Sequence, residues 1–226
     1  MAAPTDALGR PVLLVVVLAL VSLVPLLLMA TTAFVKISTV LQIARNAIGV
    51  QQVPSNTVIL ALAAVLSAVA MAPVGSAIVA RGAPVLARAN EGGDTVALVT
   101  DGLAAVEGPM RKFLVDNAEA KETARFLALA KAARPEAQRA AVTATDFAVI
   151  VPAFIVSELT RAFLLGFAVL LPFLVLDLVV ANILVAGGLA SLSPGQVSLP
   201  LKLLLFVAVD GWGLLARTLV LGYKFS

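Results

Sequence analysis

Residues 11–35, PVLLVVVLALVSLVPLLLMATTAFV, contain no charged side chain, and residues 53–80 are likewise uncharged. Each stretch is longer than the roughly 20 residues that a helix needs to cross a lipid bilayer. Over all 226 residues, 61% are hydrophobic and 13% are charged, whereas ordinary globular domains have about 45–50% and 25%. This composition favours a chain buried in a membrane or in other subunits over a free soluble enzyme.

Two residue types that carry much of enzyme chemistry are missing, since the sequence contains no cysteine and no histidine. Disulfides, thiolate nucleophiles, imidazole bases and the common zinc sites are therefore excluded. Carboxylates remain, but no cluster of them has the spacing of metal ligands. The net charge of +3 is too small to indicate a nucleic-acid partner. We expect no enzyme activity, no cofactor and no metal.

Charged residues concentrate in one part of the chain. Residues 81–146 hold 18 of the 29 charged residues, nine of each sign. The sequence thus divides into an N-terminal apolar helical hairpin (residues 1–80), a polar insert (residues 81–146) and a C-terminal apolar helical hairpin (residues 147–226). Good helix formers dominate residues 116–134 of the polar insert, which predicts a solvated helix there.

The orientation in a membrane follows from the short segments between apolar runs. Arg10 precedes the first run as in a signal peptide, but that run is longer than a typical h-region and no clean cleavage site ends it, so we expect it to be retained. Residues 36–52 carry Lys36 and Arg45 and no acid, which is typical of a short cytoplasmic loop. The polar insert would then lie on the outer side.

The C-terminal hairpin contains charges that are costly in lipid, by roughly 2.5–3.5 kcal/mol each at a helix centre. Glu158 and Arg161 are three residues apart, so they share a helix face and can form an ion pair. Asp177 and Lys202 lie at similar distances on either side of a Gly/Ser/Pro turn within residues 187–195, which predicts a second ion pair across a hairpin. These charges either hold helices together or line a polar conduit or subunit contact.

Prolines fall within or beside the apolar runs, and each removes an amide donor and tends to kink or end a helix. Non-helical backbone at membrane depth is tolerated only where protein or water satisfies it. We therefore expect an all-α chain of membrane-associated hairpins with kinked or broken helices, packed mainly against other chains. The prolines concerned are Pro25, Pro73, Pro152, Pro172 and Pro200.

Several strings, in order along both apolar blocks, resemble one known family. They are TTAFVKI (31–37), RNAIGVQQVPSN (45–56), MAPV (71–74), PAFIVSELTRAF (152–163), LPFLVLD (171–177), SLPLKLLLF (198–206) and VDGW (209–212). The chain resembles the export-gate subunit of type III secretion systems, the family that includes FliP of the flagellar apparatus and SctR (YscR, HrcR) of injectisomes. The string GVQQVP and the short segment before the first apolar run look more like the injectisome branch.

The resemblance implies an assembly and a role. Members of the family form a pentamer with smaller helical membrane subunits. The resulting conical helical pore complex belongs to the bacterial inner membrane but sits largely above its plane, although the sequence reads as transmembrane. Its closed centre is the gate through which unfolded substrates leave the cytoplasm. A separate ATPase and the proton motive force supply the energy, so this subunit would be no enzyme.

The chain departs from the family in the loop before Ser193 and Pro194. Relatives carry a run of methionines there, which forms a pliable apolar gasket around the pore, and this chain does not. The resemblance therefore implies the location of the gate but not its gasket chemistry, and leucines would give a smaller and stiffer constriction. The pore or gate residues so implied are Gly188, Leu189, Ala190, Ser191 and Leu192.

Two other classes of function stay open. A self-sufficient multi-pass transporter or channel would be stable without partners and would show internal inverted repeats, of which the sequence gives no convincing sign. A membrane-embedded enzyme would need a nucleophile or a carboxylate cluster, and the sequence offers neither.

Overall fold

The computed structural model describes residues 6–50, 54–90, 94–189 and 191–225. Within those residues the chain forms helices and no strand, which confirms the all-α prediction. The helices are α1 (Asp6–Thr31), α2 (Phe34–Ile48), α3 (Asn56–Ala70), α4 (Ala72–Asn90), α5 (Thr95–Asn117), α6 (Ala120–Ala132), α7 (Glu136–Arg139), α8 (Phe147–Ala186), α9 (Pro194–Ala208) and α10 (Gly211–Leu221).

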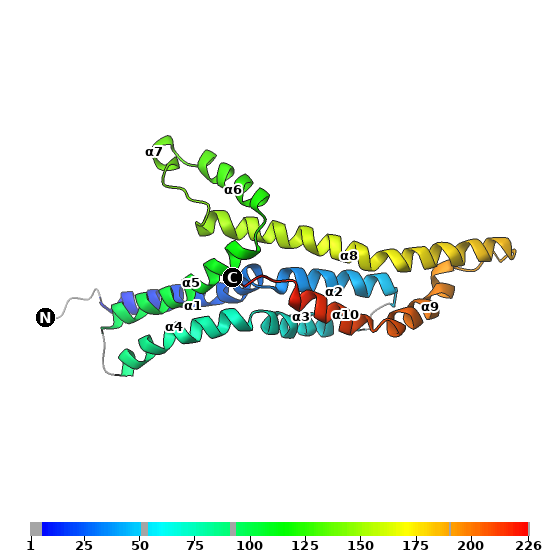
Figure 1. Ribbon diagram of the computed structural model, residues 1–226. Coiled ribbons are helices and arrows are strands. Elements are labelled where there is room, and N and C mark those ends of the chain that lie inside the picture. The colour runs from blue at the N-terminus through cyan, green and yellow to red at the C-terminus, as the bar shows by residue number, and fades with distance from the viewer. Residues whose placement is uncertain (1–5, 51–53, 91–93, 190, 226) are drawn as a thin grey trace.

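The molecule is elongated, and α8 runs along most of its length (Figure 1). Helix α2 packs along α8, with α3 and α10 on the other side of α2. Helix α9 folds back from the far end of α8, while α4 and α5 pair at the opposite end. Helices α6 and α7 form an arm that projects away from the body near the start of α8.

Helix α2 lies at the centre because apolar residues recur on it at helical spacing. Ile37, Val40, Leu41 and Ala44 are fully or almost fully buried, and this i, i+3, i+4, i+7 pattern forms one apolar stripe. The helix ends at Gly49, whose φ of 82° is the left-handed conformation that glycine adopts without strain.

The prediction that residues 36–52 form a loop is wrong for the part that the structure describes, while their cytoplasmic side stays a prediction. Residues 34–48 form α2, and the side chain of Lys36 is 2% exposed. Lys36, one of the two cations on which the prediction rests, is therefore paired inside the molecule, and Arg45 is half-buried on the same helix.

The chain has broken helices, as predicted, but of the five prolines named above only Pro73, the second residue of α4, lies at a break. Bends of 67°, 56° and 56° separate α1 from α2, α3 from α4 and α9 from α10. Pro152 and Pro172 lie inside the continuous 40-residue α8. The break between α9 and α10 occurs at Asp210, the one non-glycine residue with positive φ among the described residues.

Helix α8 begins after Asp146, which organises the turn before it. The Asp146 carbonyl accepts from the amides of Val149 and Ile150, and its carboxylate accepts from the Thr143 hydroxyl and amide. These hydrogen bonds from Thr143 favour the charged form and hold the pKa of Asp146 below its ordinary value.

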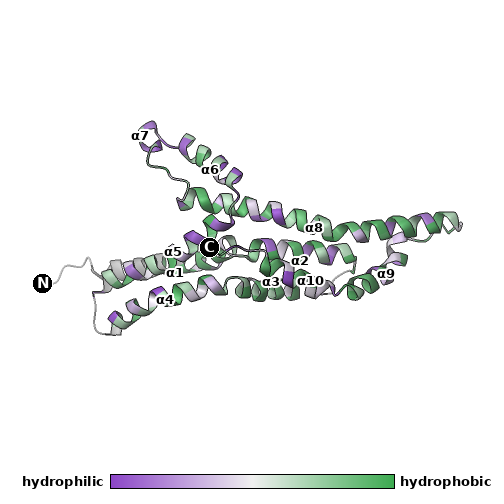
Figure 2. Ribbon diagram, viewed as in Figure 1, coloured by the Kyte–Doolittle hydropathy of each residue, from purple (hydrophilic) through white to green (hydrophobic). Residues whose placement is uncertain are grey.

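The polar insert is helical, but not as one helix over 116–134. Helix α5 ends at Asn117 and α6 begins at Ala120, and the intervening turn lets the arm leave the body. Helix α4 runs across position 80, where the apolar block and the polar insert meet. Hydrophilic residues gather on the arm and the outer ends of α4 and α5, whereas α8 is almost continuously hydrophobic (Figure 2).

One described helix, α8, is long and apolar enough to cross a membrane, and up to four spans result if each bent pair counts as one. Only 17% of the most apolar part of α8 is buried within the chain. Lipid or other subunits must therefore cover the rest, since exposed apolar surface of this extent is rare on soluble monomers.

We predict that Gly166→Leu separates α2 from α8. A β-carbon at Gly166 would lie 2.4 Å from Cδ1 of Ile43 and 3.2 Å from its Cβ, so the larger side chain overpacks the contact at a cost of about 1–3 kcal/mol. Thermal unfolding of the purified protein in detergent measures the loss. The control Gly75→Leu, in α4 with nothing within 4 Å of its β-carbon position, should not destabilise. Equal melting of the two variants would contradict the prediction.

Candidate functional site

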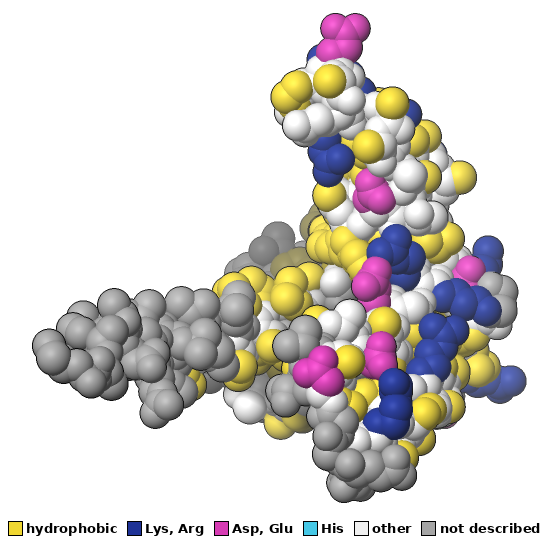
Figure 3. Space-filling view, turned by 90° about the vertical axis from the view of Figure 1, so that its left-hand side faces the viewer, with side chains coloured by type: hydrophobic (Ala, Val, Ile, Leu, Met, Phe, Trp, Pro, Cys, Tyr) yellow, Lys and Arg dark blue, Asp and Glu magenta, His cyan; other side chains and the backbone are white. Residues whose placement is uncertain are grey.

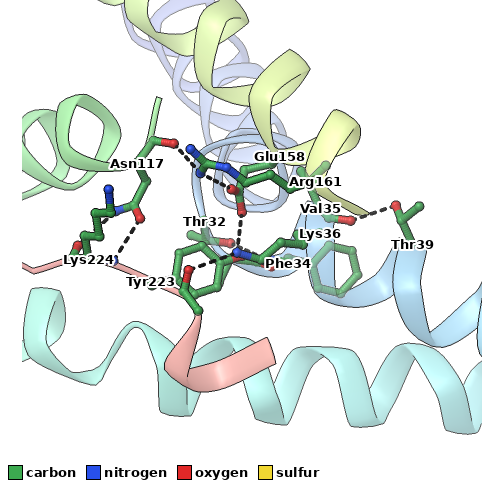
Figure 4. A network of polar contacts seen from close by, with 12 residues as sticks. Thr32, Phe34, Val35, Lys36, Thr39, Asn117, Glu158, Arg161, Tyr223 and Lys224 are labelled. Carbon is green, nitrogen blue, oxygen red and sulfur yellow. Dashed lines mark hydrogen bonds and ion pairs between the residues drawn. The ribbon is translucent and has the colours of Figure 1, made fainter. Parts of the chain in front are cut away.

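A buried ion pair joins the start of α2 to α8. Lys36 Nζ lies 3.4 Å from Oε2 of Glu158, and the two side chains are 2% and 0% exposed. Lys36 Nζ also lies 3.5 Å from the centroid of the Tyr223 ring and donates to the Gly222 carbonyl. The lysine is thus held between α8 and the segment that follows α10 (Figure 4).

Arg161 extends this pair toward the polar insert. Its Nη1 lies 3.1 Å from Oε1 of Glu158, so the two residues that are three apart in the sequence do form an ion pair. Its Nε lies 3.3 Å from Oε1 of Glu119. The same Nη1 donates to the carbonyl of Asn117 at 2.7 Å. One guanidinium therefore connects α8 to the turn between α5 and α6.

Asn117 fixes the C-terminal segment in turn. Its side-chain oxygen accepts from the amide of Lys224, and its side-chain nitrogen donates to the Lys224 carbonyl, both at 3.0 Å. The Tyr223 hydroxyl donates to the Ala33 carbonyl at 3.0 Å. Four parts of the chain, α2, α8, the α5–α6 turn and the C-terminal segment, meet in this buried network (Figure 4).

The geometry assigns the buried network a structural role. Oε2 of Glu158 has no hydrogen-bond partner among the described residues, so it depends on the ion pair with Lys36. Its side chain is fully covered, and no substrate reaches it in this conformation. Within the described part of the chain no three carboxylates lie together where they would hold a metal ion.

A second polar cluster lies across the hairpin of α8 and α9. Lys202 Nζ lies 2.6 Å from Oδ2 of Asp177. These two residues, which lie at similar distances on either side of the turn in the sequence, are therefore in contact. Ser198, one turn before Lys202, donates its hydroxyl to Oδ1 of Asp177 at 2.5 Å. Asp177 is 34% exposed and Lys202 is 8% exposed, so the cluster sits at the edge of the hairpin.

The tip loop, residues 187–193, joins these two helices at one end of the molecule (Figure 1). Gly188 has a φ of 70°, which suits glycine and lets the chain turn. Leu189 and Leu192 are 50% and 47% exposed, and Gly188 and Ser191 are exposed as well. Ala190 lies outside the described residues. The four predicted gate residues that the structure describes are thus together at the tip but are not packed against the body.

Sequence reasoning missed Lys36, Asn117 and Ser198. Lys36 is a single charge within an apolar segment, a pattern that signals a buried partner, but its partner lies on a helix beyond the polar insert. Ser198 lies one helical turn from Lys202, so its contact with Asp177 follows once the hairpin is known.

Comparison with known proteins gives the family. The FliP family model matches residues 17–219. The chain is 42% identical to the hypersensitivity response secretion protein HrcR of Ralstonia nicotianae over 211 residues, and this aligned region spans 93% of this chain and 96% of the relative. It is 42% identical over 215 residues to the Yop proteins translocation protein R of Yersinia pestis, with 93% and 95% covered.

A flagellar protein is similar too. The flagellar biosynthetic protein FliP of Caulobacter vibrioides is 39% identical over 216 residues, which span 95% of this chain and 77% of the relative. Since the family model covers nearly the whole chain, the protein belongs to the FliP family.

We predict that Glu158→Gln destabilises the protein by about 3–5 kcal/mol, because removing one partner leaves the other charge buried and unneutralised. Thermal unfolding in detergent measures the change. The control Arg88→Gln breaks an ion pair with Asp101 whose side chains are 54% and 42% exposed, and it should cost about 0–1 kcal/mol.

The double variant Lys36→Met/Glu158→Gln keeps this prediction testable if the single variant does not fold. With no buried charge left unpaired at this position, the double variant should recover part of the lost stability. If Glu158→Gln melts like Arg88→Gln, the buried pair does not carry the stability assigned to it.

We predict that Asp177→Lys and Lys202→Asp each reduce protein secretion at least about tenfold, because each variant places two like charges side by side. The double variant Asp177→Lys/Lys202→Asp restores the pair and should restore secretion. Secreted substrate in the culture supernatant is the measurement, with the membrane level of each variant as the control. A double variant that is made normally but does not secrete refutes a functional role of the pair.

Proposed function

We propose that this chain is a pore-forming subunit of the export gate of a type III protein secretion system. The observation that carries the proposal is the FliP family match over residues 17–219, together with relatives named for hypersensitivity response secretion and for Yop protein translocation. The subunit would conduct unfolded proteins across the bacterial inner membrane and would itself catalyse no reaction.

The proposed assembly is a homo-oligomer, five copies according to the family resemblance, combined with other small membrane subunits of the export apparatus. The exposed apolar surface supports an assembly. Phe163, Leu164 and Phe167 on α8 are 62%, 67% and 57% exposed. They follow the more buried part of the helix, where Ala153, Phe154 and Glu158 are fully covered. Buried residues such as Ala162 and Phe173 continue beyond it, so this part of α8 has one buried face and one exposed apolar face.

The proposed gate is the tip loop. Leu189 and Leu192 present apolar side chains there without packing against the body, and apolar constrictions close channels by expelling water. The Asp177–Lys202 pair and the Ser198 hydroxyl hold the two helices that carry this loop. A ring of tip loops from several copies would then form the constriction.

The two apolar blocks, residues 1–80 and 147–226, would associate with the membrane and the neighbouring subunits, and the polar insert would face the periplasm. We place the protein in the injectisome branch, on the string GVQQVP at residues 49–54 and on the names of the relatives that are 42% identical.

Native mass spectrometry of the detergent-extracted protein tests this function. The protein is expressed alone and together with its neighbouring export genes. Five copies bound to other small membrane subunits are the expected result, and the protein expressed alone should be unstable or form no defined oligomer. A monomer or dimer unchanged by those partners would favour the alternative, a self-sufficient transporter or channel.

We predict that Leu189→Gly/Leu192→Gly raises ion leakage and deregulates export several-fold, because it removes both apolar side chains from the constriction. Membrane potential and secretion before induction are the measurements. The control Leu129→Gly/Leu221→Gly removes two leucines that are 56% and 70% exposed, in the last turns of α6 and α10. If the two double variants leak equally, or neither leaks, the tip loop is not the gate.

A further inference from the structure

Three charged residues in the two apolar blocks lack a partner among the described residues. Residues 11–80 and 147–222 contain eight charged residues, and five of them form the ion pairs of the two polar clusters. The other three are Arg45 near the end of α2, Asp210 between α9 and α10, and Arg217 on α10. Their side chains form no ion pair or hydrogen bond with the described part of the chain.

Charges at the opposite end of the molecule need no such explanation. Figure 3 views the end at which α4 and α5 pair, and Lys, Arg, Asp and Glu side chains lie close together on that surface. Water solvates such groups, and nearby opposite charges complement them. A single charge within an apolar surface is different, because whatever covers that surface also removes the water from the charge.

Asp210 is a single charge of this kind. It is exposed, and the apolar side chains of Val207, Val209 and Leu214, within four residues of it, are 76%, 53% and 58% exposed. Lipid or protein must cover such a patch. Lipid would leave the carboxylate without a partner at a high cost. The patch therefore favours a protein surface that brings a cation.

The backbone holds this carboxylate in place. Asp210 has φ 50° and ψ 52°, a left-handed conformation that is strained for a non-glycine residue and that clusters at functional positions. Asp210 precedes α10, but its side chain does not cap the amides of that helix. The carboxylate lies over Gly213 instead, where a β-carbon would be 2.8 Å from its Cγ. Its oxygens thus stay available to a group from outside the chain.

Arg45 supplies a matching cation on another face of the same chain. It is half-buried in the last turn of α2. Val40 faces the cavity that α10 closes, and Arg45 follows it by five residues, about 140° around the helix. The last turn of α2 and the break between α9 and α10 lie at nearly the same level along the long axis of the molecule (Figure 1). The acid and the base are therefore level with each other but on different sides of the subunit.

This placement fits a ring of copies. A ring joins two different surfaces of identical subunits, whereas a two-fold dimer joins one surface to itself. Arg217 would fit the two-fold case, because it lies seven residues after Asp210, two turns along the same face of α10. Two antiparallel α10 helices would then pair each acid with the arginine of the other copy. Elongated subunits standing side by side in a ring bring Asp210 to Arg45 instead.

We propose that Asp210 of one copy forms an ion pair with Arg45 of the next copy around the ring. The exposed apolar residues of α9 and α10 surround this pair and keep water from it. Each copy supplies one acid and one base, so the same contact repeats until the ring closes. The inference rests on the homo-oligomer proposed above and identifies the residues that join its copies.

Thiol cross-linking of the full chain, expressed with its neighbouring export genes, tests the contact. The sequence contains no cysteine, so introduced thiols are the only ones in this subunit. Two versions of the chain with tags of different mass are co-expressed, one with Asp210→Cys and the other with Arg45→Cys. A short bifunctional maleimide, which bridges the length of an Asp–Arg pair, should produce a dimer that contains both tags. Asp210→Cys/Arg45→Cys on one chain should produce a ladder of up to five copies.

Two other cysteine pairs are the controls. Asp210→Cys with Arg139→Cys, which replaces an exposed cation on α7, should give no cross-link. Asp210→Cys with Arg217→Cys probes the two-fold arrangement and should give none either.

Variants without the charges measure the ion pair itself. Asp210→Asn keeps a side chain that tolerates the left-handed conformation, and Arg45→Gln removes the cation. Each should weaken association of the copies at least about tenfold, measured by native mass spectrometry on dilution in detergent. The double variant Asp210→Asn/Arg45→Gln should be no weaker than either single variant, because the two residues act through one contact. Arg217→Gln should leave association unchanged.

Three results would overturn the contact. They are an intact ring in which Asp210→Cys and Arg45→Cys do not cross-link, a cross-link between Asp210→Cys and Arg217→Cys that stops at the dimer, and losses from Asp210→Asn and Arg45→Gln that add in the double variant. In each case native mass spectrometry of the wild-type complex reports the copy number separately. A wild-type protein that forms no ring would instead contradict the export-gate assembly together with this contact, so the two failures are distinguishable.

Discussion

The buried pair between Lys36 and Glu158 is the contact on which the arrangement of the chain depends. An ionised side chain without a partner is expensive in an apolar interior, so each residue fixes the other's position. The pair brings the first turn of α2 against the middle of α8. Arg161 and Asn117 then relate the α5–α6 turn and the C-terminal segment to the same point. The pair favours one register of these helices, because a shift along α8 would separate the two charges.

The chain places charge inside and apolar surface outside. Glu158 is fully covered while Leu164, six residues further along α8, is 67% exposed. A soluble protein with this distribution would aggregate, but a subunit surrounded by lipid or by copies of itself is stabilised by it. The outer half of α8 and the tip loop are thus surfaces shaped for neighbours, and the buried network makes each subunit rigid enough to present them.

The sequence allowed some of these features to be predicted and not others, for physical reasons. Asp177 and Lys202 flank a short turn, and a hairpin sets the depth of each residue by simple counting. Lys36 and Glu158 are separated by the whole polar insert, so no local spacing relates them, and local reasoning assigns Lys36 to a loop. The helical class and the broken helices follow from composition. The positions of the breaks follow only in part. Pro73 lies at the break between α3 and α4, whereas Pro152 and Pro172 fit inside α8 and the break before α10 lies at Asp210.

The long-range bonds of the network set an order for biosynthesis. The Tyr223 hydroxyl bonds to Ala33 across 190 residues, and Lys36 bonds to Gly222 across 186. A ribosome releases the N-terminal partners first, so the start of α2 lacks these two C-terminal partners until the end of translation. Contacts of such sequence separation form slowly. The newly made subunit therefore completes this network only after the last residues of the chain have been synthesised.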